Sequence, residues 1–505
     1  MKRPPFAERA RPSTAQWKSP IRALAHSWQL TVLIAVTSFY YLFLLSNGTF
    51  QLFAPEMLDK AFANMLVHLL LGDFTVDRKA IDFEAFTRDG NTYAYFGIFS
   101  ALLRLSAMPF TDIGQAELAR LSCLAAVVIF VCLQLRMLLF VHCSLPWLCR
   151  RRQYLVVMIA ATILSGPQIY ILGSASIYHE PILWSAAMAA AFNFVIVRRA
   201  FDGERLHKRD LMWLAALAGL AINTRPSVGV ALNSATILLL LWTVWCRCAP
   251  DRRAQGPSLQ ETHLQSIALS PAVVLGLGIL VTGFVNFERW GNPLTFADFR
   301  YYDWLYRHPD FVDVFLKHGE FDVGRVWIGA LYYATGVPYL LKGVPPFDAF
   351  LRSHVAGIEA PPITPLLTNP ITILLAGIGV YRLWWKPQLC RHCASLLRLT
   401  LIGHASAVFL ILAAMFFTLR FRFDFAPFMT LSTLIGYRSV CLSVAAARED
   451  WQRRVLVTAV GLCALGILSS HYVLLIHKVW SIAVPMKVRL ALLPFAPFAH
   501  VALEP

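Results

Sequence analysis

LGDFTVDRKAIDFEAFTRDGNTYAYFGIFSALLRLSAM, residues Leu71–Met108, is the stretch around which the rest of the chain is organised. Its acidic side chains stand in a short polar run: Asp73, Asp77, Asp82, Glu84 and Asp89. The run then turns through Gly90 and Asn91 into an aromatic, increasingly apolar segment. The whole chain has only 29 acidic residues, so such a run is exceptional. We expect the hydrophobic segments to hold it over a cavity, where one of its carboxylates takes up a proton.

Composition places the chain among integral membrane proteins. Of its 505 residues, 57% are hydrophobic and 15% are charged, against a charged fraction of about 25% in soluble domains. The 45 lysines and arginines stand mostly in short loops between apolar segments, as in the cytoplasmic loops of membrane proteins. We therefore predict an all-α, polytopic membrane protein and expect no nucleic-acid partner.

About eleven apolar segments are predicted to cross the membrane, where a helix needs about 20 residues. They are Trp28–Leu45, Glu117–Val141, Tyr154–Leu172, Pro181–Val197, Leu211–Ile222, Ser227–Trp245, Ile267–Phe287, Leu366–Trp384, Leu399–Phe417, Phe425–Leu442 and Val455–Leu475. The basic loops alternate with loops of little positive charge, so the positive-inside rule predicts a cytoplasmic N-terminus and an external C-terminus. The predicted division is a basic tail at 1–27, a membrane domain at 28–475 and an external tail at 476–505.

Two long external loops are predicted, at about 47–115 and 288–365. In the first, Phe50–Leu71 has apolar positions at helical spacing, which predicts a helix in the membrane interface. Tyr93–Pro109 is apolar but interrupted by a glycine and an arginine, which indicates a half-buried or re-entrant helix. The second loop is acidic, aromatic and too long for a simple connection. We expect it to form amphipathic helices that cover a site.

The candidate proton acceptors are Asp77, Asp82 and Glu84. An ordinary solvated loop also explains such carboxylates, but the aromatic segment that follows returns toward the bilayer and places them near the mouth of a cavity. Arg420 and Arg422 are alternate residues at the end of one predicted span. They would present two cations near one spot, which predicts a phosphate-binding site.

Other external positions are candidates for substrate binding. For the pair His179 and Glu180, and for Arg225, a simpler structural explanation exists as well. His179 and Glu180 either line a site or begin a helix, where Glu is favoured in the first turn. Arg225 either contacts substrate or is a turn residue that meets lipid phosphate. Arg300, in the second external loop, adds one more cation on the same face.

Carboxylates and arginines on one face suit transfer from a lipid-phosphate donor. A base would deprotonate an acceptor hydroxyl while cations stabilise the departing phosphate. The sequence has no Walker-type loop and no dinucleotide fingerprint, so no nucleotide donor is expected. A lone C-x-x-C at Cys390–Cys393 has no second pair and predicts no metal site. No cofactor is predicted, although the external carboxylates offer the oxygen ligands that divalent cations prefer.

The order of these features resembles the GT-C superfamily of integral membrane glycosyltransferases, the group that includes the protein mannosyltransferases and the aminoarabinose transferases of lipid A. The segments that carry the resemblance are GNTYAYFGIFSALLRL, SIYHEPILW, AGLAINTRPSVGVAL, NFERWGNPLTFADFRYYDW and RFRFDFAPF. The resemblance implies a polyprenyl-phosphate-linked sugar donor, an acidic base in the first external loop, inversion at the anomeric carbon and a location in the bacterial inner membrane.

The resemblance also implies roles for single residues. Family members often have an adjacent acidic pair soon after the first span, but here the nearest acids are Glu56 and Asp59. Asp77 and Glu84, ahead of Asp82, are therefore the candidates for the base. The remaining implied binding residues are Arg225, Arg420 and Arg422 for the phosphate, His179 and Glu180 as a second polar wall, and Tyr302 as a stacking surface for a sugar ring.

Two other classes of function compete with this reading. A transporter or flippase of lipid-linked intermediates would carry charged or broken helices at mid-membrane. The predicted span centres are nearly free of charge and the polar residues gather on one face, which favours an enzyme. A non-catalytic scaffold that binds lipid-linked intermediates is separated from an enzyme only by an activity assay.

Overall fold

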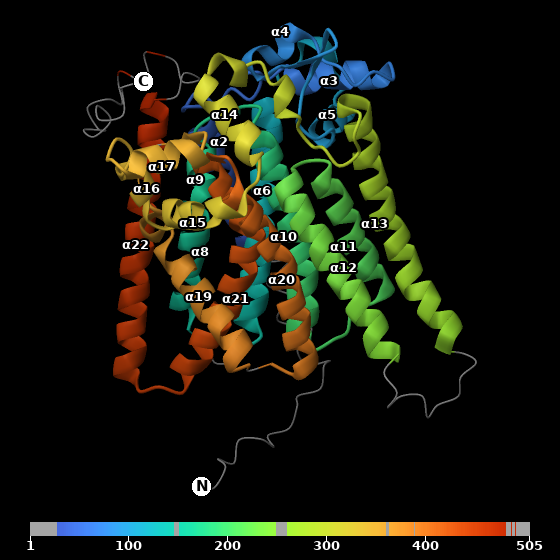
Figure 1. Cartoon of the computed structure of the whole chain (residues 1–505). Helices are drawn as coiled ribbons and strands as arrows, with labels where there is room; N and C mark the ends of the chain where they lie inside the picture. Colours follow the sequence, from blue (N-terminus) through green and yellow to red (C-terminus); the bar gives the residue numbers. More distant parts are fainter. Residues whose placement is uncertain are drawn as a thin grey trace.

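A bundle of long helices forms the body of the molecule in the computed structural model, which describes residues 28–145, 151–248, 260–359, 363–387, 389–480, 486 and 490 (Figure 1). The predicted basic tail at 1–27 and most of the tail at 476–505 lie outside these residues. The long helices are α2 (Trp28–Leu45), α6 (Ala119–Cys143), α8 (Arg152–Leu164) continued by α9 (Pro167–Ile171), α10 (His179–Asp202), α12 (Pro226–Cys248), α13 (Gln260–Trp290), α20 (Arg391–Ala413), α21 (Ala426–Ala445) and α22 (Glu449–Trp480). Two shorter helices, α11 (Lys208–Ile222) and α19 (Pro370–Trp385), pack among them.

The helical membrane architecture predicted from the sequence is confirmed. Within the described ranges, nine helical segments are long and apolar enough to cross a membrane. With α11 and α19 they account for each of the eleven predicted spans. Uninterrupted apolar stretches form helices in a membrane because only a helix satisfies every backbone donor and acceptor within one segment.

Close helix packing depends on glycine where α19 meets α21. A Cβ atom on Gly379 would lie 2.0 Å from the carbonyl oxygen of Ser432, and one on Gly436 would lie 1.8 Å from that of Leu375. Only residues without a side chain allow two helix backbones to approach so closely, which maximises van der Waals contact in a bilayer.

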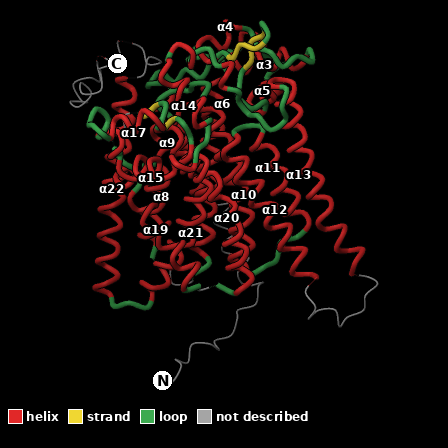
Figure 2. The backbone as a smooth tube through the Cα atoms, in the orientation of Figure 1, coloured by secondary structure: helices red, strands yellow, loops and turns green. Residues whose placement is uncertain are grey.

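A layer of short elements covers one end of the bundle, at the top of Figures 1 and 2. From the first long loop come α3 (Ala61–Leu70), α4 (Arg78–Ile81), η1 (Asp82–Glu84), β1 (Phe86–Arg88), β2 (Asn91–Tyr93), α5 (Phe99–Leu103), η2 (Arg104–Ser106) and η3 (Ile113–Gln115). From the second come η5 (Phe299–Tyr301), η6 (Leu305–Arg307), α14 (Pro309–His318), η7 (Val323–Arg325), α15 (Val326–Thr335), α16 (Val337–Leu340), α17 (Phe347–His354), β3 (Gly357–Ile358) and α18 (Pro365–Thr368). β1 and β2 form an antiparallel hairpin, and β3 pairs in parallel with β4 (Phe416–Phe417).

The helices of the first loop are shorter than the sequence pattern predicts. Phe50–Leu71 is helical only from Ala61, because Pro55 restricts the residue before it and Phe50 and Leu58 adopt positive φ angles. Tyr93–Pro109 is not one re-entrant helix, since its start pairs as a strand and its helical part begins at Phe99. The predicted short helices of the second loop are present.

Candidate functional site

Glu84 is the carboxylate of the acidic run that points into the protein. It ends the 3-10 turn η1, and its side chain is 6% exposed. The hydroxyls of Tyr178 and Tyr302 both donate hydrogen bonds to its Oε1, the second over 3.0 Å. Burial raises the pKa of Glu84 above its ordinary value, and the hydrogen bond from Tyr178 opposes that rise. The result is a buried carboxylate held in one orientation.

The surrounding aromatic side chains explain why Glu84 lies inside. Phe86, two residues later, is completely buried, and its ring stacks on Tyr302 with the centroids 4.7 Å apart. Ile81, on the other side of the 3-10 turn, is also completely buried. Apolar burial at both ends of the turn therefore pulls the acid between them out of the solvent.

Asp77 and Asp82, the other two candidate bases, lie on the outer surface. Asp77 accepts a 2.6 Å hydrogen bond from Asn64 Nδ2, and its other oxygen lies 3.6 Å from His68 Nε2. Asp82 is exposed and adopts a φ angle of 47° at the end of α4. The structure therefore separates both residues from the interior that Glu84 faces.

Arg420, which lies far from Glu84 in the sequence, is near the start of the 3-10 helix η8 (Leu419–Phe425). Its guanidinium lies over the ring of Tyr178, with the carbon 4.0 Å from the ring centroid. Its positive charge acts on Glu84 and opposes the pKa rise that burial causes there. The base candidate and a phosphate-binding candidate thus meet across Tyr178.

Arg422 points into a different space from Arg420, because residues two apart on a 3-10 helix project about 120° from each other. Its Nη1 donates a 2.9 Å hydrogen bond to the carbonyl of Ile363, while its buried Nε and Nη2 have no hydrogen-bond partner. The side chain lines a cavity of about 370 Å³ between α6, α8, α19, α21 and α22. Most of the wall is apolar, with Leu138, Met158, Leu412, Phe423, Leu434 and Val473 among the lining residues.

Glu359 lies between the two arginines and was missed by the sequence analysis. Its carboxylate accepts a 2.7 Å hydrogen bond from the backbone of Leu419 and a further one from Tyr170. Burial raises the pKa of Glu359, and both Arg420 and Arg422 oppose the rise. The residue as a whole is exposed, while its carboxylate is surrounded by protein atoms. Its only sequence signal was an acid alone in an apolar segment, AGIEAPP.

Glu320 is a second carboxylate that the sequence analysis passed over. The pKa of Glu320 is raised to about 8 by burial, with Arg325 opposing. Arg325 is completely buried and fixes this turn by donating to the backbone carbonyls of Gly319, Glu320 and His354. Glu84, Glu320 and Arg420 all lie near enough to Tyr95 to influence its hydroxyl, so these groups gather under the loop layer in a region that we call the recess.

Glu180 and Arg225 are each paired with another side chain. Both oxygens of Glu180 bind the guanidinium of Arg104, one over 2.7 Å, and the carboxylate is 1% exposed. This buried pair fastens α10 to the first loop and leaves Glu180 no room for a substrate. Arg225 binds both oxygens of Asp424, one over 2.5 Å, and so fixes the C-terminal end of η8, the helix that carries the two arginines.

The remaining predicted binding residues are divided between the recess and the surface. The buried His179 has its Nδ1 2.7 Å from the carbonyl of Ser174, and the charge of Arg420 reaches it. Tyr302 donates a hydrogen bond to Glu84, and its ring stacks on Phe86 rather than facing a space where a sugar ring could stack. Arg300 pairs with Asp298 over 2.6 Å while its own side chain is 65% exposed, and it lies outside the recess.

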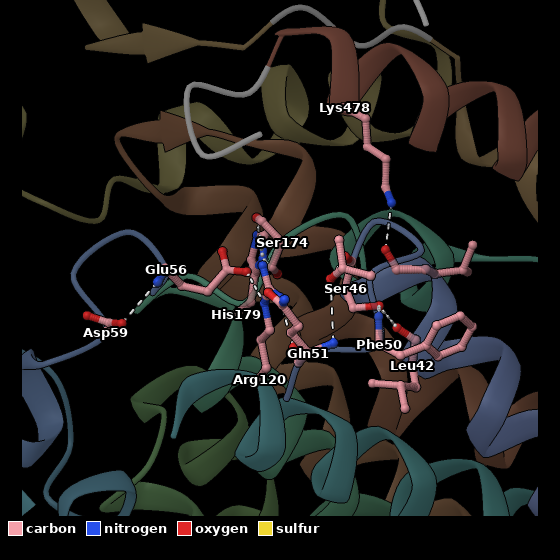
Figure 3. A network of polar contacts seen from close by, with 12 residues as sticks. Leu42, Ser46, Phe50, Gln51, Glu56, Asp59, Arg120, Ser174, His179 and Lys478 are labelled. Carbon is pink, nitrogen blue, oxygen red and sulfur yellow. Dashed lines mark hydrogen bonds and ion pairs between the residues drawn. The ribbon is translucent and has the colours of Figure 1, made fainter. Parts of the chain in front are cut away.

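Glu56, the first acid after α2, is part of a separate network, shown in Figure 3. Its carboxylate pairs with Arg120 of α6, whose Nη1 donates to the carbonyl of Gln51 over 2.9 Å. Asp59 accepts from the backbone of Glu56, and nearby Lys478 donates to the carbonyl of Leu44 over 2.6 Å. These contacts tie the first loop to α6 and tie α22 to α2, so the acids nearest the first span have a structural role.

The binding of a divalent cation by the external carboxylates stays a prediction. In the part of the chain that the structure describes, no group of three or more His, Cys, Asp or Glu side chains is placed to hold a metal ion. Cys390 and Cys393 are joined by a disulfide at the start of α20, which leaves no thiolate pair there for a metal.

No protein-family model and no curated protein sequence matches the chain. Among solved structures, the chain is similar to the oligosaccharyltransferase AglB of Archaeoglobus fulgidus, in complex with an inhibitory peptide and a dolichol-phosphate, at 12% identity and a TM-score of 0.45 over 95% of this chain and 60% of that one. An oligosaccharyltransferase of the same organism in the apo form is 12% identical, with a TM-score of 0.46, over 96% of this chain and 62% of that one. ArnT of Cupriavidus metallidurans, bound to undecaprenyl phosphate, is 13% identical to this chain, with a TM-score of 0.38. The match covers 94% of this chain and 71% of that one.

These structural neighbours are membrane glycosyltransferases of the GT-C superfamily. That is the superfamily which the sequence resembles. The chain spans roughly three fifths of the length of the oligosaccharyltransferases.

Proposed function

We propose that this chain is a glycosyltransferase that moves a sugar from a polyprenyl-phosphate donor to an acceptor hydroxyl. One observation carries the proposal: a guanidinium with two unpartnered donor nitrogens, on Arg422, lines a largely apolar cavity of about 370 Å³ between membrane-spanning helices. Such a cavity accepts a hydrocarbon chain, and the guanidinium supplies the donors that an anionic head group needs.

The phosphate is assigned to the free donors of Arg422, and Arg420, whose side chain points elsewhere, adds positive charge nearby. Donor nitrogens left without a partner inside a protein are costly, and a phosphate oxygen would satisfy them with charge-assisted hydrogen bonds. Glu359 lies close to both arginines and offsets part of their positive charge. The prenyl chain would extend from this point along the apolar walls.

The base is assigned to Glu84. In the proposed reaction the acceptor oxygen attacks the anomeric carbon, its proton passes to Glu84, and the bond from that carbon to the phosphate oxygen breaks. The leaving phosphate keeps the electron pair, and the arginines stabilise its charge. Tyr178 and Tyr302 hold the Glu84 carboxylate in position. Attack from the side opposite the leaving phosphate inverts the configuration at that carbon.

The recess is proposed to open on the external face of a bacterial inner membrane. The basic residues of the loops at the other end of the bundle support this orientation through the positive-inside rule, with the N-terminus in the cytoplasm. Asp77, Asp82 and Arg300 would then lie on the external surface, away from the proposed reaction.

A transfer assay tests the proposal. The full-length chain, purified into nanodiscs, is incubated with radiolabelled undecaprenyl-phosphate sugars and a membrane extract, and lipids and polymers are separated. We expect label to move to a new acceptor with the wild type and with Asp77→Asn, and not with Glu84→Gln. No transfer with any donor by a wild type that still binds undecaprenyl phosphate would favour a flippase or a scaffold instead.

A further inference from the structure

A second cluster of arginines lies away from the recess, between α19 and α21. These two helices run side by side toward the end of the bundle opposite the loop layer (Figure 1). The close backbone approach at Gly379 and Gly436 draws the helices together. Arg382, one turn after Gly379, and Arg438, two residues after Gly436, consequently line one small hollow.

Neither arginine has a counter-ion among the residues that the structure describes. In the described part of the chain, no carboxylate oxygen lies within the 4.0 Å of an ion pair from either guanidinium. Arg438 lies over the ring of Phe201 at 5.4 Å, and its buried Nε has no hydrogen-bond partner. Arg382 donates only a long hydrogen bond, 3.3 Å, to the hydroxyl of Ser443. Two partly buried cations without an acid between them favour the binding of an anion that reaches both.

The shape of the hollow indicates which anion fits. Its interior of about 10 Å³ holds one water-sized group, such as a single phosphate oxygen, so the rest of the ligand must remain outside. Its walls are otherwise mostly apolar, with Phe201, Leu383, Pro387, Leu389 and Ile435 around the two arginines. Guanidinium groups bind phosphate oxygens with paired hydrogen bonds, and apolar walls next to membrane-spanning helices suit acyl chains.

We propose that Arg382 and Arg438 bind the phosphate head group of an anionic phospholipid, in the leaflet opposite the recess. The same donors could be reached by inorganic phosphate, which shares the chemistry but lacks the acyl chains. This site is independent of the proposed transferase activity, since it lies at the other end of the bundle.

The test compares lipid binding by the delipidated full-length protein and by its variants. Native mass spectrometry counts bound phosphatidylglycerol and phosphatidylcholine, and a parallel arm adds inorganic phosphate alone. The variants are Arg382→Gln, Arg438→Gln and Arg438→Lys. Arg453→Gln is the matched control, because Arg453 is an exposed arginine at the same end of the bundle.

We expect the wild type and Arg453→Gln to retain phosphatidylglycerol in preference to phosphatidylcholine. Each Gln variant should bind it roughly 10-fold more weakly, as for the loss of one charge-assisted hydrogen bond, and Arg438→Lys should fall between. Arg382 is partly exposed, so its variant tests the site even if Arg438→Gln does not fold. Unchanged phosphatidylglycerol binding in Arg382→Gln, or equal competition by inorganic phosphate at the same concentration, would overturn the proposal.

Discussion

Arg420 lies over the face of the Tyr178 ring at 4.0 Å, and the hydroxyl of the same tyrosine donates to Glu84. One aromatic side chain therefore contacts both a cation proposed to stabilise the charge of the phosphate and the carboxylate proposed to act as the base. The two groups come from loops more than 300 residues apart in the sequence. Their distance from each other is set by a rigid ring rather than by flexible chain, which suits a reaction that needs both at once.

Glu84→Gln should lower the transfer rate by roughly 10²- to 10⁴-fold, the usual contribution of a general base. The amide keeps the shape of the carboxylate but cannot take a proton. Undecaprenyl-phosphate binding should stay within a factor of two, because the phosphate contacts are unchanged. Single-turnover transfer and lipid binding are measured on the same preparation, beside Asp82→Asn as an exposed acid of the same turn. Full activity in Glu84→Gln would move the base to another carboxylate.

Tyr302→Phe should shift the pH dependence of transfer upward. A hydrogen bond to a carboxylate stabilises its charged form and lowers its pKa, so removing the 3.0 Å bond from Tyr302 to Glu84 raises that pKa further. A reaction that needs deprotonated Glu84 gains rate as pH rises through its pKa, so the variant reaches half of its maximal rate about one pH unit higher.

The exposed Tyr306 supplies the control for that shift. Tyr306→Phe removes a hydroxyl from the same loop without touching Glu84, and its pH profile should match the wild type. An identical profile for Tyr302→Phe would mean that Glu84 does not titrate in the rate-limiting step.

Arg422→Gln should weaken undecaprenyl-phosphate binding by roughly 10- to 150-fold, corresponding to the 1.5–3 kcal/mol of a hydrogen bond to a charged group. Binding is measured by titration in nanodiscs. Arg300→Gln, at an arginine that is 65% exposed and paired with Asp298, should leave the affinity unchanged. If the effects of the two substitutions were reversed, the phosphate site would lie on the surface of the loop layer instead of in the cavity.

Glu320→Gln should change how stability depends on pH. The pKa of Glu320 is about 8 in the folded protein because of burial, against about 4.3 in an unfolded chain. The folded state therefore holds a proton that the unfolded state has lost, and wild-type stability falls as pH rises through this window. The melting temperature of Glu320→Gln relative to wild type should rise from pH 5 to pH 9. Glu449→Gln, at an exposed acid, should show no such trend.

Glu180→Gln should destabilise the fold rather than alter catalysis alone. The substitution leaves Arg104, 2% exposed, as a buried charge with a neutral partner, and breaking a buried pair costs about 3–5 kcal/mol. Thermal unfolding in detergent should show a clear loss of stability. Replacing both members, as in Arg104→Leu with Glu180→Leu, should recover part of it. A stable Glu180→Gln protein with weakened donor binding would restore the substrate role expected from the sequence.

The helices of this protein follow from its sequence because hydropathy is a local property. A run such as Ala119–Cys143 forms a spanning helix whatever its neighbours are, since a bilayer leaves the backbone no other way to satisfy its hydrogen bonds. Nine of the eleven predicted spans are accordingly present as helices long and apolar enough to cross a membrane, and the other two are present as the shorter helices α11 and α19. Where local signals competed, as at Pro55 and at the β1–β2 hairpin, the predicted helices of the first loop were too long.

The site depended on pairings that no local pattern contains. Arg225 and Glu180 look alike in the sequence, as ionisable residues at the start of spans, yet each is paired with a partner that only the folded chain supplies. Glu84 and Asp82 are two residues apart, but one is buried under two tyrosines and the other is exposed. The sequence by itself determined the membrane fold and the face that carries the polar groups. Tertiary packing decided which of those groups are left without a partner, because desolvation and ion pairing depend on neighbours far away in the chain.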